Sequence, residues 1–204
     1  MKPTHRTLAD LGLLLESDPK LPSVAGLVAG EPVKGSWWGH PKGHAIFRAL
    51  RELAARPDVL VCKLVSGKVT FVDRRLWPAV VAVGTAREPW QMSKLSRAAR
   101  SLLAQVTREG RVEVSGEAVR ELERILLIYS EQVHTESGAH AKVLETWERW
   151  GGAAARLTPE RGKRELERVL AELNRRFGGN GRLDRKSTRL NSSHSRASRM
   201  PSSA

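Results

Sequence analysis

The sequence predicts a mainly α-helical protein with one β-hairpin, divided into an N-terminal and a C-terminal domain. Over the first 75 residues, apolar periodicity and turn residues predict the order helix, helix, helix, hairpin. Beyond residue 89 the apolar residues recur mainly at helical spacing. The first pattern is typical of a winged helix-turn-helix, in which one helix enters the major groove and a hairpin flanks it. We therefore expect a winged helix-turn-helix-like N-terminal domain plus a helical C-terminal domain.

Three helices are expected before the hairpin. The first is predicted over residues 4–18, where four leucines recur at helical spacing. The second, over residues 23–30, is short, with Ser23 as its N-cap and Gly30 as its stop. The third spans residues 44–58 and carries an apolar stripe that we expect to be buried. That stripe comprises Ile46, Phe47, Leu50, Leu53 and Ala54.

The hairpin follows directly. Two runs rich in β-branched residues, 59–65 and 68–72, are separated by the dipeptide Ser66-Gly67, which is typical of a tight turn. An apolar helix is predicted over residues 74–86, with Pro78 tolerated in its first turn. We place the boundary between the domains near residues 85–93, giving domains 1–88 and 89–183.

The second half is expected to be helical except for one short strand, 111–115. The last helix has Thr158 as its N-cap and Pro159 at its first position, which is the residue order favoured there. The predicted helices cover residues 93–110, 116–133, the end of 134–150 after a turn, and 158–177.

The composition is ordinary for a globular protein but strongly basic. The chain of 204 residues has a formal net charge of +13, which favours a polyanionic partner. Cys62 is the single cysteine, so a disulfide within the chain and a multi-cysteine zinc site are excluded, and we expect it to pack as a small apolar side chain. No apolar run approaches the roughly 20 residues that span a bilayer, and the N-terminus lacks the pattern of a secretory signal. We predict a cytoplasmic protein without membrane association, metal or cofactor.

Residues 184–204 are predicted to be a disordered tail that is not natural protein sequence. The stretch DRKSTRLNSSH resembles the translation of a common short-read sequencing adapter, and SRMPSSA resembles its continuation after a short index. We therefore expect the natural gene to have been cut near Leu183. Without the five Lys/Arg and one Asp of this tail, 30 basic and 21 acidic side chains remain, a net charge of +9.

The third helix and its surroundings carry the pattern of a nucleic-acid-binding surface. His44, Arg48 and Arg51 lie at positions i, i+4 and i+7, on one face of that helix, where they contact phosphates or base edges in this interpretation. An adjacent Trp pair offers one ring for packing and one for stacking on a base. The alternatives are a solvated helix face and two Trp packing anchors. The candidate residues are Lys34, Trp37, Trp38, His40, Lys42, His44, Arg48, Arg51, Lys68, Arg74 and Arg75.

A second constellation lies in the stretch EQVHTESGAH. His134, Glu136 and His140 are weak candidates for acid–base chemistry, because histidine and carboxylate together can exchange protons. The H-x-E spacing also occurs in zinc deaminases, but the P-C-x-x-C that those enzymes require is missing. Helix capping and surface hydrogen bonding are the alternative roles, and no metal site is predicted.

The stretches GSWWGHPKGHAIF and VLVCKLVSGKVTFVDRRLWPA resemble a functionally uncharacterised bacterial family with an S-W-W-x-H-P-x-G and K-L-V-x-G-K-V-T-F-V-x-R-R-L-W-P core. The resemblance covers roughly residues 23–80. Some members are similar to winged-helix proteins related to the alkylpurine DNA glycosylase AlkZ. That similarity implies a winged-helix fold and a role at DNA. It assigns no catalytic residue here, and Asp73 stands where the family pattern often has histidine.

Three functions are consistent with these features. The first is a DNA-binding module that uses the third helix and the hairpin. The second is a protein-interaction module, which predicts an exposed apolar patch. The third is an enzyme acting on nucleic acid and related to DNA glycosylases, which requires the candidate histidines to converge on the Trp pair. The sequence does not fix the oligomeric state.

Overall fold

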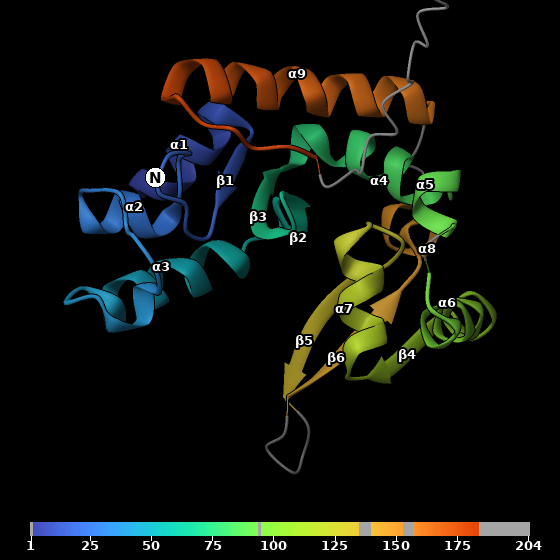
Figure 1. Cartoon of the computed structure of the whole chain (residues 1–204). Coiled ribbons are helices and arrows are strands. Elements are labelled where there is room, and N and C mark those ends of the chain that lie inside the picture. Colours follow the sequence, from blue (N-terminus) through green and yellow to red (C-terminus); the bar gives the residue numbers. More distant parts are fainter. Residues whose placement is uncertain (1, 94, 135–139, 153–156, 184–204) are drawn as a thin grey trace, which may run out of the picture.

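The protein is a mixed α/β fold rich in helix, with two small antiparallel sheets of three strands each (Figure 1). This computed structural model describes residues 2–93, 95–134, 140–152 and 157–183. Within those ranges no helix has both the length and the apolar composition to cross a membrane. The predicted tail, residues 184–204, lies outside the described residues.

The first unit contains α1 (Pro3–Leu11), β1 (Leu13–Leu15), α2 (Val24–Ala29), α3 (Gly43–Ala54), β2 (Val59–Val65) and β3 (Lys68–Asp73). A 3₁₀ turn, η1 (Trp37–Gly39), lies between α2 and α3. The helix predicted over residues 4–18 is wrong beyond its first half, because Gly12 adopts a left-handed conformation (φ 80°) and ends α1. The three leucines that follow pair with β3 instead, which buries all of them.

The sheet of this unit has the order β1-β3-β2, and β2 and β3 form the predicted hairpin around Ser66-Gly67. Helices α1, α2 and α3 pack on it through a core that includes Leu8 and Ile46. The predicted stripe of α3 is confirmed for Ile46, Leu50 and Leu53. It is wrong for Phe47, which keeps 41% of its surface exposed, and for Ala54, which is exposed at the end of the helix.

The C-terminal half is not the helical domain that the sequence predicted. It contains α6 (Arg97–Glu109), β4 (Arg111–Val114), α7 (Glu117–Arg124), β5 (Tyr129–His134) and β6 (His140–Glu145). The strands form a second sheet in the order β4-β6-β5. The predicted helix over residues 116–133 is wrong after Arg124, since Leu126 has a positive φ of 57° and the chain then pairs with β6. Both sheets thus share the order first, third, second strand.

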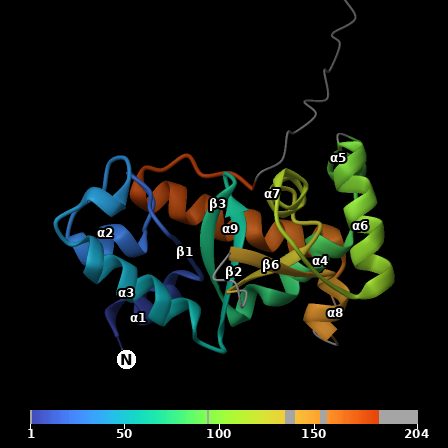
Figure 2. The ribbon, with the colours of Figure 1, turned by 90° about the horizontal axis from the view of Figure 1, so that it is seen from below.

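The remaining elements join the two halves. They are η2 (Arg74–Leu76), α4 (Trp77–Thr85), α5 (Pro89–Met92), α8 (Trp147–Gly151) and α9 (Pro159–Phe177). α9 packs along α4 and extends past β3 toward α1 (Figure 1 and Figure 2). The chain after α9 returns to the hairpin, where Leu183 forms a bridge with Val65. One hydrophobic core therefore contains residues from Leu13 to Leu183, on both sides of the expected domain boundary.

The N-cap of α2 gives a first test of this structure. The buried Ser23 hydroxyl accepts a hydrogen bond from the Gly26 N–H at 3.1 Å, so Ser23→Ala leaves that donor unpaired. We expect a loss of about 1 kcal/mol in the free energy of unfolding, measured by urea denaturation. Ser101→Ala, at an exposed position inside α6, is the control and should leave the midpoint almost unchanged. Equal midpoints for both variants would show that this cap does not stabilise α2.

Candidate nucleic-acid interface

The outer face of α3 carries three of the predicted site residues. Because Ile46, Leu50 and Leu53 turn inward at helical spacing, the residues between them face solvent. His44, Arg48 and Arg51 are all exposed. Among the described residues, no carboxylate forms an ion pair with either of the two arginines. Their charges are therefore available to an external anion.

The Trp pair lies at the N-terminal end of this face. Trp37 is buried, and its indole N–H donates to Glu16 Oε1 at 2.7 Å. Trp38 is 67% exposed and stacks on Trp37, with the ring centroids 4.0 Å apart. The ring centroids of Phe47 and Trp38 are 5.6 Å apart. The Arg51 guanidinium lies over the Phe47 ring, 5.8 Å from its centroid. The rings of Trp38 and Phe47 thus border the cationic face of α3.

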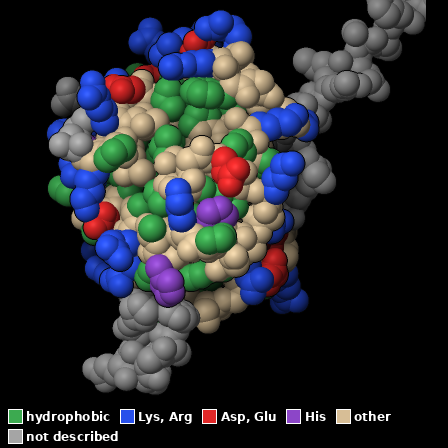
Figure 3. All heavy atoms as spheres, turned by 90° about the vertical axis from the view of Figure 1, so that its left-hand side faces the viewer, with side chains coloured by type: hydrophobic (Ala, Val, Ile, Leu, Met, Phe, Trp, Pro, Cys, Tyr) green, Lys and Arg blue, Asp and Glu red, His purple; other side chains and the backbone are tan. Residues whose placement is uncertain are grey.

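Figure 3 shows the side of the molecule on which α2 and α3 lie, with hydrophobic side chains interspersed among polar atoms and Lys and Arg gathered around them. The exposed large apolar side chains of this region are Leu27, Trp38 and Phe47. The surface therefore combines an apolar centre with a basic rim, and it has the features of both a nucleic-acid and a protein contact.

Two other predicted residues near α3 have local structural roles. The Lys42 ammonium donates to the Ala29 carbonyl at 2.8 Å and so compensates the negative end of α2. His40 Nδ1 accepts from the Lys42 backbone N–H at 3.1 Å. Lys34 is exposed in the loop between α2 and η1. The loop is consequently held against α2, which fixes the position of the Trp pair.

The hairpin cations are less available than the sequence implied. Lys68 pairs with Asp18 at 2.7 Å. Burial raises the pKa of Asp18, but the Lys68 ammonium and two backbone N–H groups outweigh that effect and hold the pKa below its ordinary value. Arg75 pairs with Asp73 at 2.7 Å and also donates to the Ala9 carbonyl at the end of α1. Both cations are thus partly neutralised by acidic neighbours.

The turn of the hairpin is also covered. The Ser66 N–H donates to the Arg182 carbonyl at 2.6 Å, and the Arg182 N–H donates to the Ser66 hydroxyl at 3.2 Å. The hairpin tip is therefore bound to the segment that follows α9, and it is not a free wing. Arg74, at the opposite end of β3, is exposed and forms no ion pair within the described ranges.

The structure describes two of the three candidate catalytic residues, His134 and His140. The register of β5 and β6 sets His134 opposite His140 at the end of the second hairpin. Glu136 lies outside the described residues. The stretch 134–150 was expected to hold a turn followed by a helix; in its described residues it forms the end of β5 and all of β6, and only its last residues are helical, in α8 (Trp147–Gly151). In the described part of the chain, no three His, Cys, Asp or Glu side chains gather as a potential metal site.

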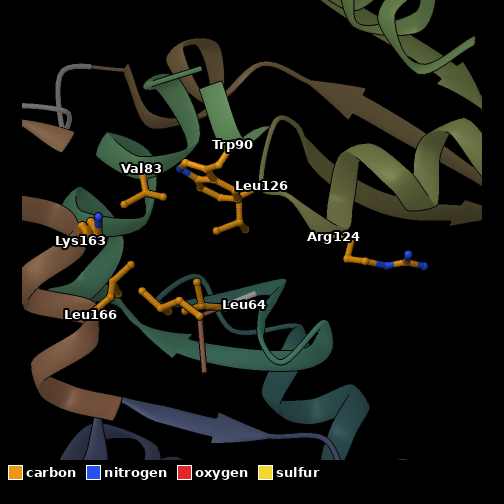
Figure 4. A pocket seen from close by; sticks show the side chains of 8 residues that line it. Leu64, Val83, Trp90, Arg124, Leu126, Lys163 and Leu166 are labelled. Atoms are coloured by element: carbon orange, nitrogen blue, oxygen red, sulfur yellow. The ribbon is translucent and has the colours of Figure 1, made fainter. Parts of the chain in front are cut away.

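An apolar pocket between β2, α4 and α9 is too small for a ligand. Its volume is about 10 Å³, which is roughly the space for one water molecule. Figure 4 shows apolar side chains converging there from these elements, while the Arg124 side chain extends away from them. The Cys62 thiol packs against the same hydrophobic core, and burial raises its pKa to about 12, so it is a thiol and not a thiolate at neutral pH.

One polar cluster was not predicted from the sequence. The Glu123 carboxylate, from α7, is buried and contacts Lys63 of β2, Lys142 of β6 and Ser130 of β5. Burial raises the pKa of Glu123, but hydrogen bonds from Lys142 and Ser130 and the nearby Lys63 ammonium outweigh that effect and hold the pKa below its ordinary value. These residues are distant in sequence and lack a motif, so local patterns could not connect them.

No family model, curated protein or solved structure matches the chain.

Proposed function

We propose that the protein binds duplex DNA through α3, in a winged-helix-like module formed by residues 3–73. The observation that carries this proposal is the pair Arg48 and Arg51, exposed on α3 and unpaired with any carboxylate in the described part of the chain. The order of elements, helix-strand-helix-helix-hairpin, and the sheet order β1-β3-β2 support a helix-turn-helix with an added hairpin.

In this proposal the two guanidinium groups contact phosphates or guanine edges, and each phosphate contact releases condensed counterions. Arg74 and Lys34 extend the positive surface on either side. The covered turn at Ser66 takes no part in binding, so α3 supplies most of the contact. Trp38 offers an aromatic plane at the edge of the helix.

The test is a fluorescence anisotropy titration of labelled duplex DNA at about 50 and about 200 mM salt, where phosphate-mediated binding should weaken steeply. Arg48→Gln combined with Arg51→Gln should lower the affinity at low salt by about tenfold or more and reduce the salt slope by about two. Arg108→Gln combined with Arg168→Gln removes the same charge from exposed positions on α6 and α9 and is the matched control.

Two results would contradict this proposal. One is absence of binding at low salt, and the other is equal weakening by both double variants, which would indicate a general effect of net charge.

A second candidate function is protein interaction, favoured by the exposed, neighbouring rings of Trp38 and Phe47 and by the exposed Leu27 of α2. A protein partner that covers Trp38 should shift its fluorescence emission to shorter wavelength, because the indole leaves water. The first function is favoured over this one if DNA binding persists fully in Trp38→Ala but is lost in the Arg48→Gln, Arg51→Gln double variant.

A further inference from the structure

A second concave site lies between the first sheet and the C-terminal half. It is a pocket of about 330 Å³, within the size range of small-molecule sites, and we refer to it as the α7 pocket. Three cationic side chains reach it from different elements, namely Lys63 of β2, Arg120 of α7 and Lys142 of β6. The remaining lining residues are Ser115, Gly116, Val119, Gln132 and Ala141.

The two lysines of this pocket are held in place by one buried carboxylate. Lys63 Nζ lies 2.9 Å from Glu123 Oε2, and Lys142 contacts Oε1, which also accepts from the Ser130 hydroxyl at 2.5 Å. A single carboxylate cannot balance two ammonium groups, and each ammonium has three donors. The lysine side chains remain 26% and 31% exposed, so both keep access to an entering anion.

Arg120 adds a third positive charge at the rim. Its side chain is 62% exposed, and its guanidinium lies 3.4 Å from the carboxylate of Glu117, whose side chain is 72% exposed. A pair so open to water is weak, and it leaves most donors of the guanidinium to other partners. The charged residues that line the pocket are thus three cations, two of which contact the buried Glu123 while the third contacts the exposed Glu117.

The N-terminus of α7 opens on the same pocket. Gly116 is its N-cap, with a φ of 129° that L side chains rarely adopt, and no side chain caps the first turn. The backbone N–H groups of that turn thus lack a side-chain acceptor. Ser115 and Gly116 are among the lining residues, so these donors and the three cations lie around one site.

We propose that the α7 pocket binds the phosphate group of a small phosphate monoester, such as a mononucleotide. A terminal phosphate enters the pocket end-on and presents three oxygens, which the lysines, Arg120 and the α7 N–H groups can share. The phosphodiester of a duplex is a second source of the same chemistry, but its chain continues on both sides and fits a recessed site less well. This site does not include α3, so the inference is independent of the proposed DNA-binding function.

The experiment is isothermal titration calorimetry of the whole protein with adenosine 5′-monophosphate, inorganic phosphate and adenosine. We expect the first two to bind and adenosine to give no measurable heat, because the phosphate is the recognised group. Arg120→Gln should weaken binding of the monophosphate by about tenfold, the usual effect of losing one charge-assisted contact. The variant removes an exposed side chain, so it should fold normally.

The matched control is Arg124→Gln, on the same helix but outside the lining of the α7 pocket. It should change the affinity by less than about twofold. Lys142→Met is a second test variant, and its fold is checked by far-ultraviolet circular dichroism because it leaves Glu123 with one fewer partner. A folded Lys142→Met protein should bind the monophosphate at least about tenfold more weakly.

Several results would overturn the proposal. They are no heat with either phosphate compound, equal binding of adenosine, or equal weakening by Arg120→Gln and Arg124→Gln. A duplex without terminal phosphates that competes with the monophosphate in an Arg120-dependent manner would assign the pocket to DNA backbone and also overturn it. Because the α3 variants leave this pocket intact, failure here is distinguishable from failure of DNA binding.

Discussion

Replacing Trp147 by alanine should destabilise the protein by about 3–5 kcal/mol, the usual cost of removing a buried large aromatic side chain. Trp147 begins α8 and is 1% exposed, and it packs in the core that joins both halves of the chain. Its ring meets Trp150 at 5.6 Å and Tyr129 at 5.9 Å, both edge to face. On the α4 side the ring lies directly against the Gly84 backbone, where a Cβ would come within 2.3 Å of it, so the ring fills this space closely and its removal leaves a cavity.

The measurement is equilibrium unfolding in urea, followed by far-ultraviolet circular dichroism. Trp38→Ala is the control, because Trp38 is 67% exposed, and it should cost much less. Trp147→Phe should also cost less than alanine, because it keeps most of the buried ring. The indole N–H that it removes has no hydrogen-bond partner among the described residues. Equal losses for the alanine variants at 147 and 38 would contradict the packing described for α8.

Replacing Glu123 by glutamine should lower the free energy of unfolding by about 2–4 kcal/mol at pH 7. The change leaves Lys63 and Lys142 partly buried without their carboxylate, although both can still reach water. The pKa of Glu123 is below its ordinary value in the folded protein, so its ionised form is stabilised by folding. That contribution is fully present above about pH 4.5 and is lost as the pH falls through the lower, folded pKa.

The difference between the parent protein and Glu123→Gln should therefore shrink when urea denaturation is repeated near pH 3. Glu172→Gln is the control, since Glu172 pairs with Arg175 on the exposed face of α9 and should not measurably change the midpoint at either pH. A difference for Glu123→Gln that stays constant between the two pH values would show that its charge is not what stabilises the cluster.

Much of the helical structure was predictable because it depends on neighbouring residues. Ser23, Gly30 and Thr158 were recognised as caps or stops, and the structure confirms each of them. The tight turn at Ser66-Gly67 was likewise predicted from two residues and their flanks. In all these cases the hydrogen bond or backbone angle that ends the element belongs to the same few residues that the pattern contains.

The errors fall where an apolar run pairs with a distant strand. Leu13–Leu15 fits a helix by spacing, yet it pairs with residues almost sixty positions later in β3. Tyr129–His134 continues an amphipathic pattern, yet it pairs with β6. Helical and strand patterns overlap for short apolar segments, so only the partner strand decides between them.

The candidate site divides in the same way. The helical period and the buried stripe of α3 together predicted that Arg48 and Arg51 share one exposed face. The sequence did not predict the ion pair of Lys68 with Asp18 or the covering of Ser66 by Arg182. Asp18 and Arg182 approach the hairpin only when the chain is folded. The Glu123 cluster is a third case of this kind, since it joins three strands and one helix.

The sequence by itself determined the basic charge of this protein, the ends of α2 and the start of α9, the first hairpin and the cationic face of α3. Each of these follows from composition or from residues within a few positions of one another. The tertiary structure alone decided the second sheet, the covering of the hairpin and the α7 pocket. Those features depend on contacts between segments far apart in the chain, and their energy appears only when the segments meet.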